Sequence, residues 1–393
     1  MRHRLRFLPW TAAARGSSAA ARVSSDRVYW STWGWFQLRD GGAGSNSGSY
    51  EEVYPSSSLY RRAPVTFGEP IHWKFAKEMF MEARSTFVAE IADGCAWGLN
   101  GAVVTSDGML LADVSLEPGQ DSYRDPREHS FFQQQSPVPE RISGTVVVLS
   151  NLHGHKSYFH WLFDVIPRLA LLRKSQVPLT GDEKYLVNSL DYAFQSESLA
   201  LAGVAPRNII CGDSVPYLQA DRLIVPSYPG LSGIVPKWAC DFLRESMLGD
   251  VSPKGADGRR IYISRRHASR RQVLNEDELT ELLQEFGFCI VDPADMSVRE
   301  QARLFSSASL VVSQHGAGLA NLVFCPEGAA VLELFTPNLM NACYWAVSNL
   351  LGIRYHYLTF PHAPEPSQAR AHDMMVDLAR LSGALKQIGV ARR

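Results

Sequence analysis

The chain has 393 residues, of which 46% are hydrophobic and 20% charged, and its formal net charge is -1. Single hydrophobic cores stop growing at about 250–300 residues, so this length predicts two domains. The charge balance excludes a global field that would recruit nucleic acid. No stretch reaches the roughly 20 apolar residues of a membrane span, and the basic N-terminus lacks the apolar core of a signal peptide. We therefore expect a cytoplasmic protein that binds no nucleic acid, has no transmembrane segment and makes at most peripheral contact with a membrane.

The N-terminal half is expected to be irregular at first and then rich in β-structure. Residues 1–50 predict disorder, because residues 41–49 read GGAGSNSGS. Residues 84–115 alternate or run apolar, with a hairpin turn at residues 106–108. Residues 116–142 are polar and predict a surface excursion.

Two series of short apolar runs, each separated by helical stretches, predict βαβ units and parallel sheets. The first series lies at residues 145–150, 184–189, 208–212 and 222–227, and the second at residues 260–266, 288–293, 309–314 and 330–335. The stretch SPKGADG at residues 252–258 is a plausible linker between them. The predicted organisation is an N-terminal domain at 51–251, a C-terminal domain at 258–361 and a helical tail at 362–393.

Two helices of the second series have clear start signals. Asn275 and Glu278 have capping-box spacing, and the apolar residues that follow keep a helical period as far as Gly287. Ser297 and Glu300 repeat the signal for a second helix.

The segment SQHGAGL at residues 313–319 follows an apolar strand and predicts an anion site. A strand that leads through glycines into a helix leaves backbone N–H groups unpaired at the helix start, where the helix dipole also favours an anion. His315 could donate a hydrogen bond to the same phosphate. The alternative is a tight turn whose glycines serve packing alone.

Basic residues cluster between residues 254 and 271, and two of them, Arg265 and Arg266, end the first predicted strand of the second series. Arg265 and Arg266 stand where open α/β sheets bind ligands, and guanidinium groups there could grip a diphosphate. The alternative, a solvated basic loop, is favoured for Arg259, Arg260 and one of the pair Arg270 and Arg271. Glu333 stands in the apolar strand VLELF and needs a buried partner; ribose hydroxyls or an arginine would supply one.

The segment NLHGHKSYFHWLFDVIPR at residues 151–168 follows the strand TVVVLS. His160 and Asp164 stand four apart and share a helix face, which suits a general base for an acceptor hydroxyl. The alternatives are an ordinary helix pair of Asp164 with Arg168, and a metal site on His153, His155 and His160. No strong zinc spacing supports the metal site, and no cysteines stand at C-x-x-C spacing, so we expect no bound metal, no other cofactor and reduced thiols.

Three segments together resemble family 61 glycosyltransferases. They are YFHWLFDVIPRLALL at 158–172, YISRRHASRRQVLNEDELTELLQEFGFCIVDP at 262–293 and FSSASLVVSQHGAGLANLVFCPEGAAVLELF at 305–335. Residues 90–115 also resemble the leading β region of the bacterial members. The resemblance covers about residues 50–361 and implies an α/β, GT-B-like fold, in which two Rossmann-like domains face each other across a cleft, here with a β-rich N-terminal region.

The family resemblance implies an inverting, metal-independent transfer from a nucleotide-sugar, with UDP as the expected carrier. The acceptor would be a glycan or lipid-linked glycan, and the role would be capsular or exopolysaccharide synthesis. By position, Asp164 and His160 would be catalytic, and the donor would be bound by Arg265, Arg266, His315, Gly316, Ala317, Gly318 and Glu333. A nucleotide-sugar epimerase and a non-catalytic nucleotide- or glycan-binding protein are the alternatives.

Overall fold

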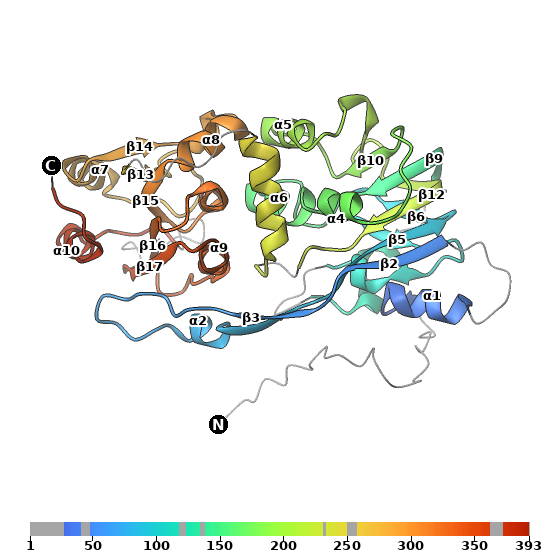
Figure 1. The fold of residues 1–393 in the computed structure, drawn as a ribbon, viewed down its shortest axis with the longest axis horizontal. Helices are drawn as coiled ribbons and strands as arrows, with labels where there is room; N and C mark the ends of the chain where they lie inside the picture. Colours follow the sequence, from blue (N-terminus) through green and yellow to red (C-terminus); the bar gives the residue numbers. More distant parts are fainter. Residues whose placement is uncertain are drawn as a thin grey trace, which may run out of the picture.

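The computed structural model describes residues 27–40, 48–117, 123–133, 138–230, 233–249, 258–361 and 372–392. The mixed α/β class expected from the sequence is confirmed, and the strands form a ten-stranded sheet, a five-stranded sheet and a two-stranded ribbon. Figure 1 shows the two large sheets side by side, with helix α6 (Lys237–Leu248) between them. The expected linker at 252–258 and the first part of the expected tail fall largely outside the described residues.

The ten-stranded sheet joins the β-rich region to the first series of apolar runs. Its order is β1-β8-β7-β6-β12-β9-β10-β11, with β5 paired to both β12 and β2. The strands β12, β9, β10 and β11 run parallel to one another. The bounds are β1 Val28–Tyr29, β2 Gly48–Tyr54, β5 Thr86–Ala92, β6 Cys95–Trp97, β7 Ala102–Val104, β8 Leu110–Leu111, β9 Glu140–Val148, β10 Lys184–Val187, β11 Ile209–Cys211 and β12 Tyr217–Pro226.

The five-stranded sheet is entirely parallel and has the order β14-β13-β15-β16-β17. Its strands are β13 Arg259–Ile263, β14 Phe288–Val291, β15 Ala308–Gln314, β16 Ala330–Phe335 and β17 Arg354–Thr359. Four of them match the second predicted series, and β17 is an addition that the sequence analysis did not expect. From β13 the chain passes to β14 on one side and then returns to β15 on the other side of β13. The gap between β13 and β15 is therefore a topological switch point, where open α/β sheets bind ligands.

Helices cover both sheets. In the N-terminal half they are α1 Thr32–Asp40, α2 Trp73–Lys77, α3 Tyr158–His160, the π-helical turn η4 Trp161–Val165, α4 Arg168–Lys174 and α5 Ala193–Leu201. In the C-terminal half they are α7 Glu276–Glu285, α8 Val298–Phe305, the 3-10 helix η7 Ala317–Phe324, α9 Cys343–Leu351 and α10 Leu378–Ile388. Short 3-10 turns lie at Ala112–Val114, Pro126–Glu128, Ser130–Gln133, Pro206–Asn208 and Pro293–Asp295.

Both predicted helices of the second series form, but only one has its capping box. Ser297 and Glu300 satisfy each other's backbone N–H groups at the start of α8. Asn275 makes no such bond at the start of α7, because its side chain exchanges two hydrogen bonds with the backbone of Val376. The Asn275 side chain therefore bonds to the backbone of Val376, just before α10, and does not cap α7.

The first 50 residues differ from the expected disorder where they are described. Residues 27–40 form β1 and α1, and Trp35 of α1 is fully buried. Residues 1–26 and 41–47 lie outside the described residues. The prediction of disorder over residues 1–50 relied on the glycine- and serine-rich composition of residues 41–49, which does not extend to residues 27–40.

A β-ribbon arm links the two halves. The strands β3 Ser57–Tyr60 and β4 Phe80–Ala83 pair with each other, and the arm runs from the ten-stranded sheet beneath the five-stranded one (Figure 1). Its Arg62 carbonyl accepts a hydrogen bond from Trp345, and the Val65 amide donates to Tyr355. The predicted boundary, with residues 51–251 all in one N-terminal domain, therefore does not describe the arm.

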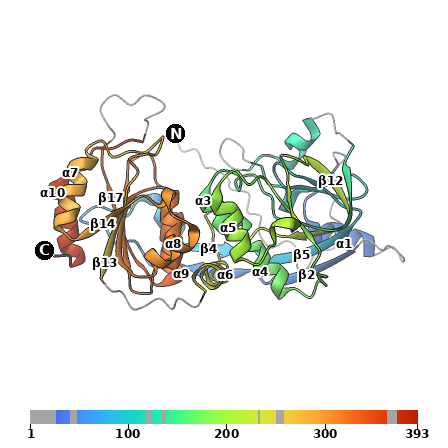
Figure 2. The same cartoon turned by 90° about the horizontal axis from the view of Figure 1, so that it is seen from above.

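One apolar core runs through both halves. It joins Leu162 and Val165 of η4, Leu243 of α6, and Leu322 and Phe324 of η7. Figure 2, seen from above, shows α3 and α5 of the first half facing α8 of the second, with α6 beside them. All six cysteines are free, as expected. Among the described residues, no helix is long and apolar enough to cross a membrane.

Candidate functional site

The carboxyl ends of β13 and β15 meet at the switch point of the five-stranded sheet. After β15, Gly316 has extended backbone and is the N-cap of η7. The amides of Gly316, Ala317 and Gly318 make no hydrogen bond with the described residues. These N–H groups stand at the positive end of an eight-residue helix, an arrangement that favours an anion.

Arg265 follows β13 and lies against Gly316. A Cβ atom at position 316 would stand 2.1 Å from its Nη1 atom, so only glycine leaves room for the guanidinium there. The side chain also donates to the carbonyls of Arg270 and Arg271, at 3.0 and 3.2 Å. Burial, and then the charge of Arg271, lower the pKa of Arg265 to about 10, so it remains cationic at neutral pH.

The structure separates the two arginines that the sequence analysis could not distinguish. Arg266 is exposed and pairs with Asp277 at the start of α7. Arg271, which the sequence left as one of two alternatives, is half-buried and lies within electrostatic reach of Tyr344 and Glu333. Its guanidinium makes no hydrogen bond with a described residue, which makes Arg271 a second candidate cation beside Arg265.

His315, directly after β15, lies beside Glu333 of β16. Nδ1 of His315 is 2.5 Å from Oε1 of Glu333, and the Tyr355 hydroxyl donates to Oε2, also at 2.5 Å. Glu333 is fully buried, so both carboxylate oxygens are used within the protein. These contacts favour neither of the partners expected from the sequence: no described arginine pairs with Glu333, and a ribose contact stays a prediction. The carboxylate instead fixes the His315 ring, and Nε2 makes no hydrogen bond with a described residue.

His160 and Asp164 meet at the other side of the interface between the halves. Nδ1 of His160 is 2.6 Å from Oδ2 of Asp164, and both side chains are partly exposed, by 22% and 13%. The Ser157 side chain caps α3, and the chain then widens into the π-helical turn η4. Such turns often occur at functional sites. The predicted sharing of one helix face is confirmed.

Arg168 is not the partner of Asp164. It is fully buried, and its guanidinium donates to the Pro226 carbonyl at 3.0 and 2.5 Å and to the Ser150 carbonyl at 3.1 Å. Burial lowers its pKa to about 10. Arg168 therefore joins the carboxyl ends of β9 and β12, and the sequence analysis missed this role because a helical i,i+4 spacing suggested a simpler one.

The three histidines of this segment do not form a metal site with other ligands. The ring of His153 stacks on His160 at 4.7 Å, and burial lowers the pKa of His153. Among the described residues, no three His, Cys, Asp or Glu side chains gather closely enough to hold an ion. Independence from metal remains a prediction about activity.

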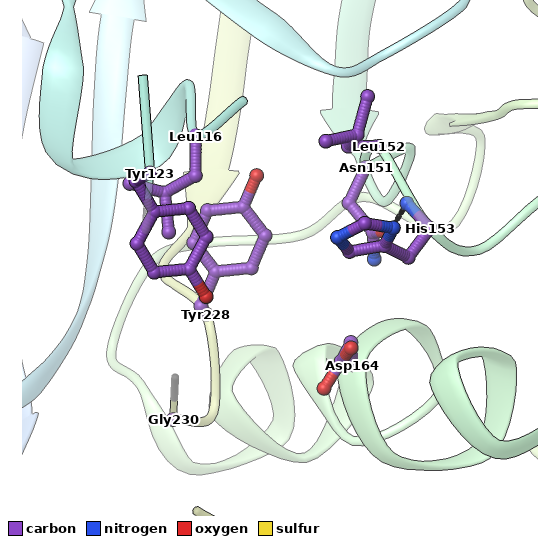
Figure 3. A pocket seen from close by; sticks show the side chains of 8 residues that line it. All are labelled: Leu116, Tyr123, Asn151, Leu152, His153, Asp164, Tyr228 and Gly230. Carbon is purple, nitrogen blue, oxygen red and sulfur yellow. Dashed lines mark hydrogen bonds between the residues drawn. The ribbon is translucent and has the colours of Figure 1, made fainter. Parts of the chain in front are cut away.

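A hollow opens next to Asp164 at the carboxyl ends of β9 and β12. Figure 3 shows Tyr123 and Tyr228 on one side, Asn151 and His153 on the other, and Asp164 below. Sequence analysis did not name Asn151 or the tyrosines as site residues. Asn151 and Tyr228 directly follow two predicted strands, which was their only signal, and Tyr123 lies in the stretch that was predicted to be a surface excursion.

Direct contacts connect the two parts of the site. The Tyr158 hydroxyl of α3 donates to Asn321 of η7 at 3.2 Å. The Tyr344 ring packs against Phe159 at 5.5 Å and against His315 at 5.3 Å. The segment carrying His160 and Asp164 therefore faces the segment carrying His315 and the free amides of η7.

Comparison with known proteins identifies a family that is similar to the region containing these residues. The family model Glycosyltransferase 61 matches residues 158–332, which run from α3 to β16 and include both parts of the site. Over this region the chain is similar to the glycosyltransferase 61 family. Glu333 lies one residue beyond the match.

Several curated glycosyltransferases are similar to part of the chain. The EGF domain-specific O-linked N-acetylglucosamine transferase of Mus musculus is 36% identical over 110 residues, which cover 26% of this chain and 20% of the relative. Its namesake in Drosophila melanogaster is 35% identical over 118 residues, covering 29% and 22%. The alpha-1,3-arabinosyltransferase XAT3 of Oryza sativa subsp. japonica is 32% identical over 103 residues, covering 24% and 18%. The chain thus matches only about a fifth of the length of these relatives.

Proposed function

We propose that the protein is an inverting glycosyltransferase that takes a sugar from a UDP-sugar and transfers it to a glycan acceptor. The observation that carries the proposal is the meeting of Arg265 with the free amides of Gly316–Gly318 at the switch point between β13 and β15. A diphosphate needs such donors, and the similarity to the glycosyltransferase 61 family over residues 158–332 supports sugar transfer. In this proposal the two sheets act as the two domains of a GT-B enzyme.

The proposed reaction is a single displacement. The acceptor oxygen forms a bond to the anomeric carbon of the donor sugar while the bond from that carbon to the diphosphate breaks. The Arg265 guanidinium and the amides at the start of η7 stabilise the negative charge that develops on the leaving diphosphate. The proton of the acceptor hydroxyl passes to the His160–Asp164 pair.

Asp164 is the proposed proton acceptor of that pair. It lines the hollow, and its Oδ2 is held by His160. Arg168, one turn further on, makes no hydrogen bond with Asp164 and is bonded to carbonyls instead. His160 is then the positioning residue.

We also propose that no metal ion is needed, because Arg265 and the η7 amides supply positive charge at the diphosphate. Activity should therefore survive EDTA. Complete loss on chelation, restored by manganese, would overturn this part of the proposal.

The proposal is tested by turnover. The full chain is incubated with a panel of nucleotide-sugars, with and without glycan acceptors, and released UDP and product are measured. We expect acceptor-dependent release of UDP and a product of inverted anomeric configuration by NMR. Conversion of the donor sugar without acceptor would indicate an epimerase, and UDP binding without release from any donor would indicate a binding protein.

The position of the donor site is tested by a matched pair of variants. Arg265→Ala removes the guanidinium beside Gly316, and Arg266→Ala removes the exposed neighbour that pairs with Asp277. A lost charge-assisted contact costs about 1.5–3 kcal/mol, so we expect Arg265→Ala to weaken UDP binding by roughly 10- to 100-fold. Arg266→Ala should bind UDP like the parent. Equal effects of the two substitutions would contradict the placement.

A further inference from the structure

The hollow beside Asp164 contains a buried amide with an unused donor. Asn151 is 2% exposed, and its Nδ2 atom makes no hydrogen bond with the described residues. Its Oδ1 atom accepts from the amides of His153 and Gly154, at 2.9 and 2.8 Å. Buried amide donors are rarely left without an acceptor, so this one calls for a partner that the chain does not supply.

The orientation of the Asn151 side chain is fixed by its surroundings. The Asn151 backbone donates to Oδ1 of Asn188 at 3.1 Å and accepts from Nδ2 of Asn188 at 2.6 Å. Arg168 holds the preceding carbonyl, that of Ser150. With backbone and Oδ1 both held, Nδ2 cannot turn away from the hollow, where Figure 3 shows the side chain above Asp164.

The opposite side of the hollow offers carbon surface. Leu116, Tyr123 and Tyr228 lie there, and Leu152 adds to it from the loop of Asn151 (Figure 3). The Tyr228 ring is held in place by the Arg168 guanidinium, 5.3 Å from the ring centroid. The hollow therefore combines an apolar, aromatic side with a polar side of amide, imidazole and carboxylate.

We propose that this hollow binds one sugar ring of a saccharide acceptor, with Nδ2 of Asn151 donating a hydrogen bond to a ring oxygen or hydroxyl and the reacting hydroxyl directed at Asp164. The proposal rests on the proposed glycosyltransferase function and adds the place where the acceptor sugar binds and the residue that orients it. A sugar ring suits such a lining because it carries C–H groups on its faces and hydroxyls at its edge, and aromatic rings attract the former.

A peptide acceptor suits the hollow less well. A Ser or Thr side chain would bring its own backbone N–H and C=O groups, which need partners when buried. Two backbone donors of the loop, the amides of His153 and Gly154, are already bonded to Asn151. The amide of Asn151 is bonded to Asn188.

The test uses a variant that changes only the unused donor. Asn151→Asp keeps an oxygen for the amides of His153 and Gly154 but replaces the Nδ2 donor by a second oxygen. Asn341→Asp is the matched control, because Asn341 caps the Cys343 amide in the same way from an exposed position. The full chain is saturated with UDP, and binding of methyl pyranosides of xylose, galactose, glucose and mannose is followed by saturation-transfer NMR.

We expect at least one methyl glycoside to bind the parent and the Asn341→Asp variant equally. Loss of one hydrogen bond to the amide should weaken that binding about tenfold in Asn151→Asp, with UDP affinity and melting temperature close to those of the parent. Unchanged glycoside binding in Asn151→Asp would overturn the proposal.

Two further outcomes would also count against it. The first is a parent that binds UDP but none of the glycosides, and the second is binding of a blocked threonine peptide in preference to every glycoside. If the parent fails to bind UDP, the proposed function itself fails, and this result is distinct from a failure at Asn151. If Asn151→Asp melts far below the parent, Tyr228→Phe, which keeps the ring over Arg168, and Tyr228→Leu provide a second comparison: only the latter should lose glycoside binding.

Discussion

Replacing Gly316 by alanine tests the donor site by geometry alone. The added Cβ would stand 2.1 Å from Nη1 and 2.8 Å from Cζ of Arg265. Gly316 has a φ of -177°, an extended conformation that alanine adopts without strain. The clash falls on the end of a flexible side chain, so the fold should survive while the guanidinium is displaced by about 1 Å or more to reach ordinary van der Waals separation.

The displacement should remove one charge-assisted contact to the diphosphate. Such a contact contributes about 1.5–3 kcal/mol, so the dissociation constant for UDP should rise roughly 10- to 100-fold. Calorimetry with UDP measures this, and thermal unfolding checks the fold. Gly383→Ala in α10 is the control, because a Cβ there meets no atom within 4 Å. Parent-like UDP binding by a folded Gly316→Ala variant would show that Arg265 does not hold the diphosphate.

Two further predictions concern the N-terminal half of the site. Asp164→Asn should lower turnover by about 100- to 10,000-fold, the usual contribution of a general base, and leave the UDP dissociation constant nearly unchanged. His160→Ala should lower turnover less. Single-turnover rates measure both effects, and normal turnover in both variants would remove the pair from the mechanism. Arg168→Lys should lower the free energy of unfolding in urea by about 3 kcal/mol, because one ammonium group cannot donate to the carbonyls of both Ser150 and Pro226 as the guanidinium does. An unchanged unfolding midpoint would contradict the conclusion that Arg168 links β9 and β12.

Local signals in the sequence located the parallel strands and the reciprocal cap of α8, because these depend on neighbours in the chain. The cap of α7 depends on Val376, about a hundred residues away, and the sequence gives no sign of that contact. The same limit applies to β17 and to the β3–β4 arm, whose partners lie far along the chain.

The motifs that contain the candidate site residues could be predicted from the sequence, but the contacts between those residues could not. Sequence reasoning identified that Glu333 needs a buried partner, but the partners are His315 and Tyr355, brought there by the parallel pairing of β15, β16 and β17. The choice between Arg265 and Arg266 was not possible from the sequence. Adjacent side chains point in different directions, and which one faces the η7 amides depends on the path of the folded loop. Sequence reasoning left Asn151 unnamed, because an unused donor is visible only when every other bond is known.

The central claim, that a nucleotide diphosphate binds at the switch point between β13 and β15, is tested most directly by hydrogen–deuterium exchange with and without UDP. The amides of Gly316, Ala317 and Gly318 have no partner among the described residues and should exchange rapidly in the free protein. The account predicts that UDP slows exchange in the peptide spanning residues 314–319 and in the loop of Arg265 to Arg271. Protection confined to other segments, with rapid exchange at residues 316–318 in saturating UDP, would contradict it.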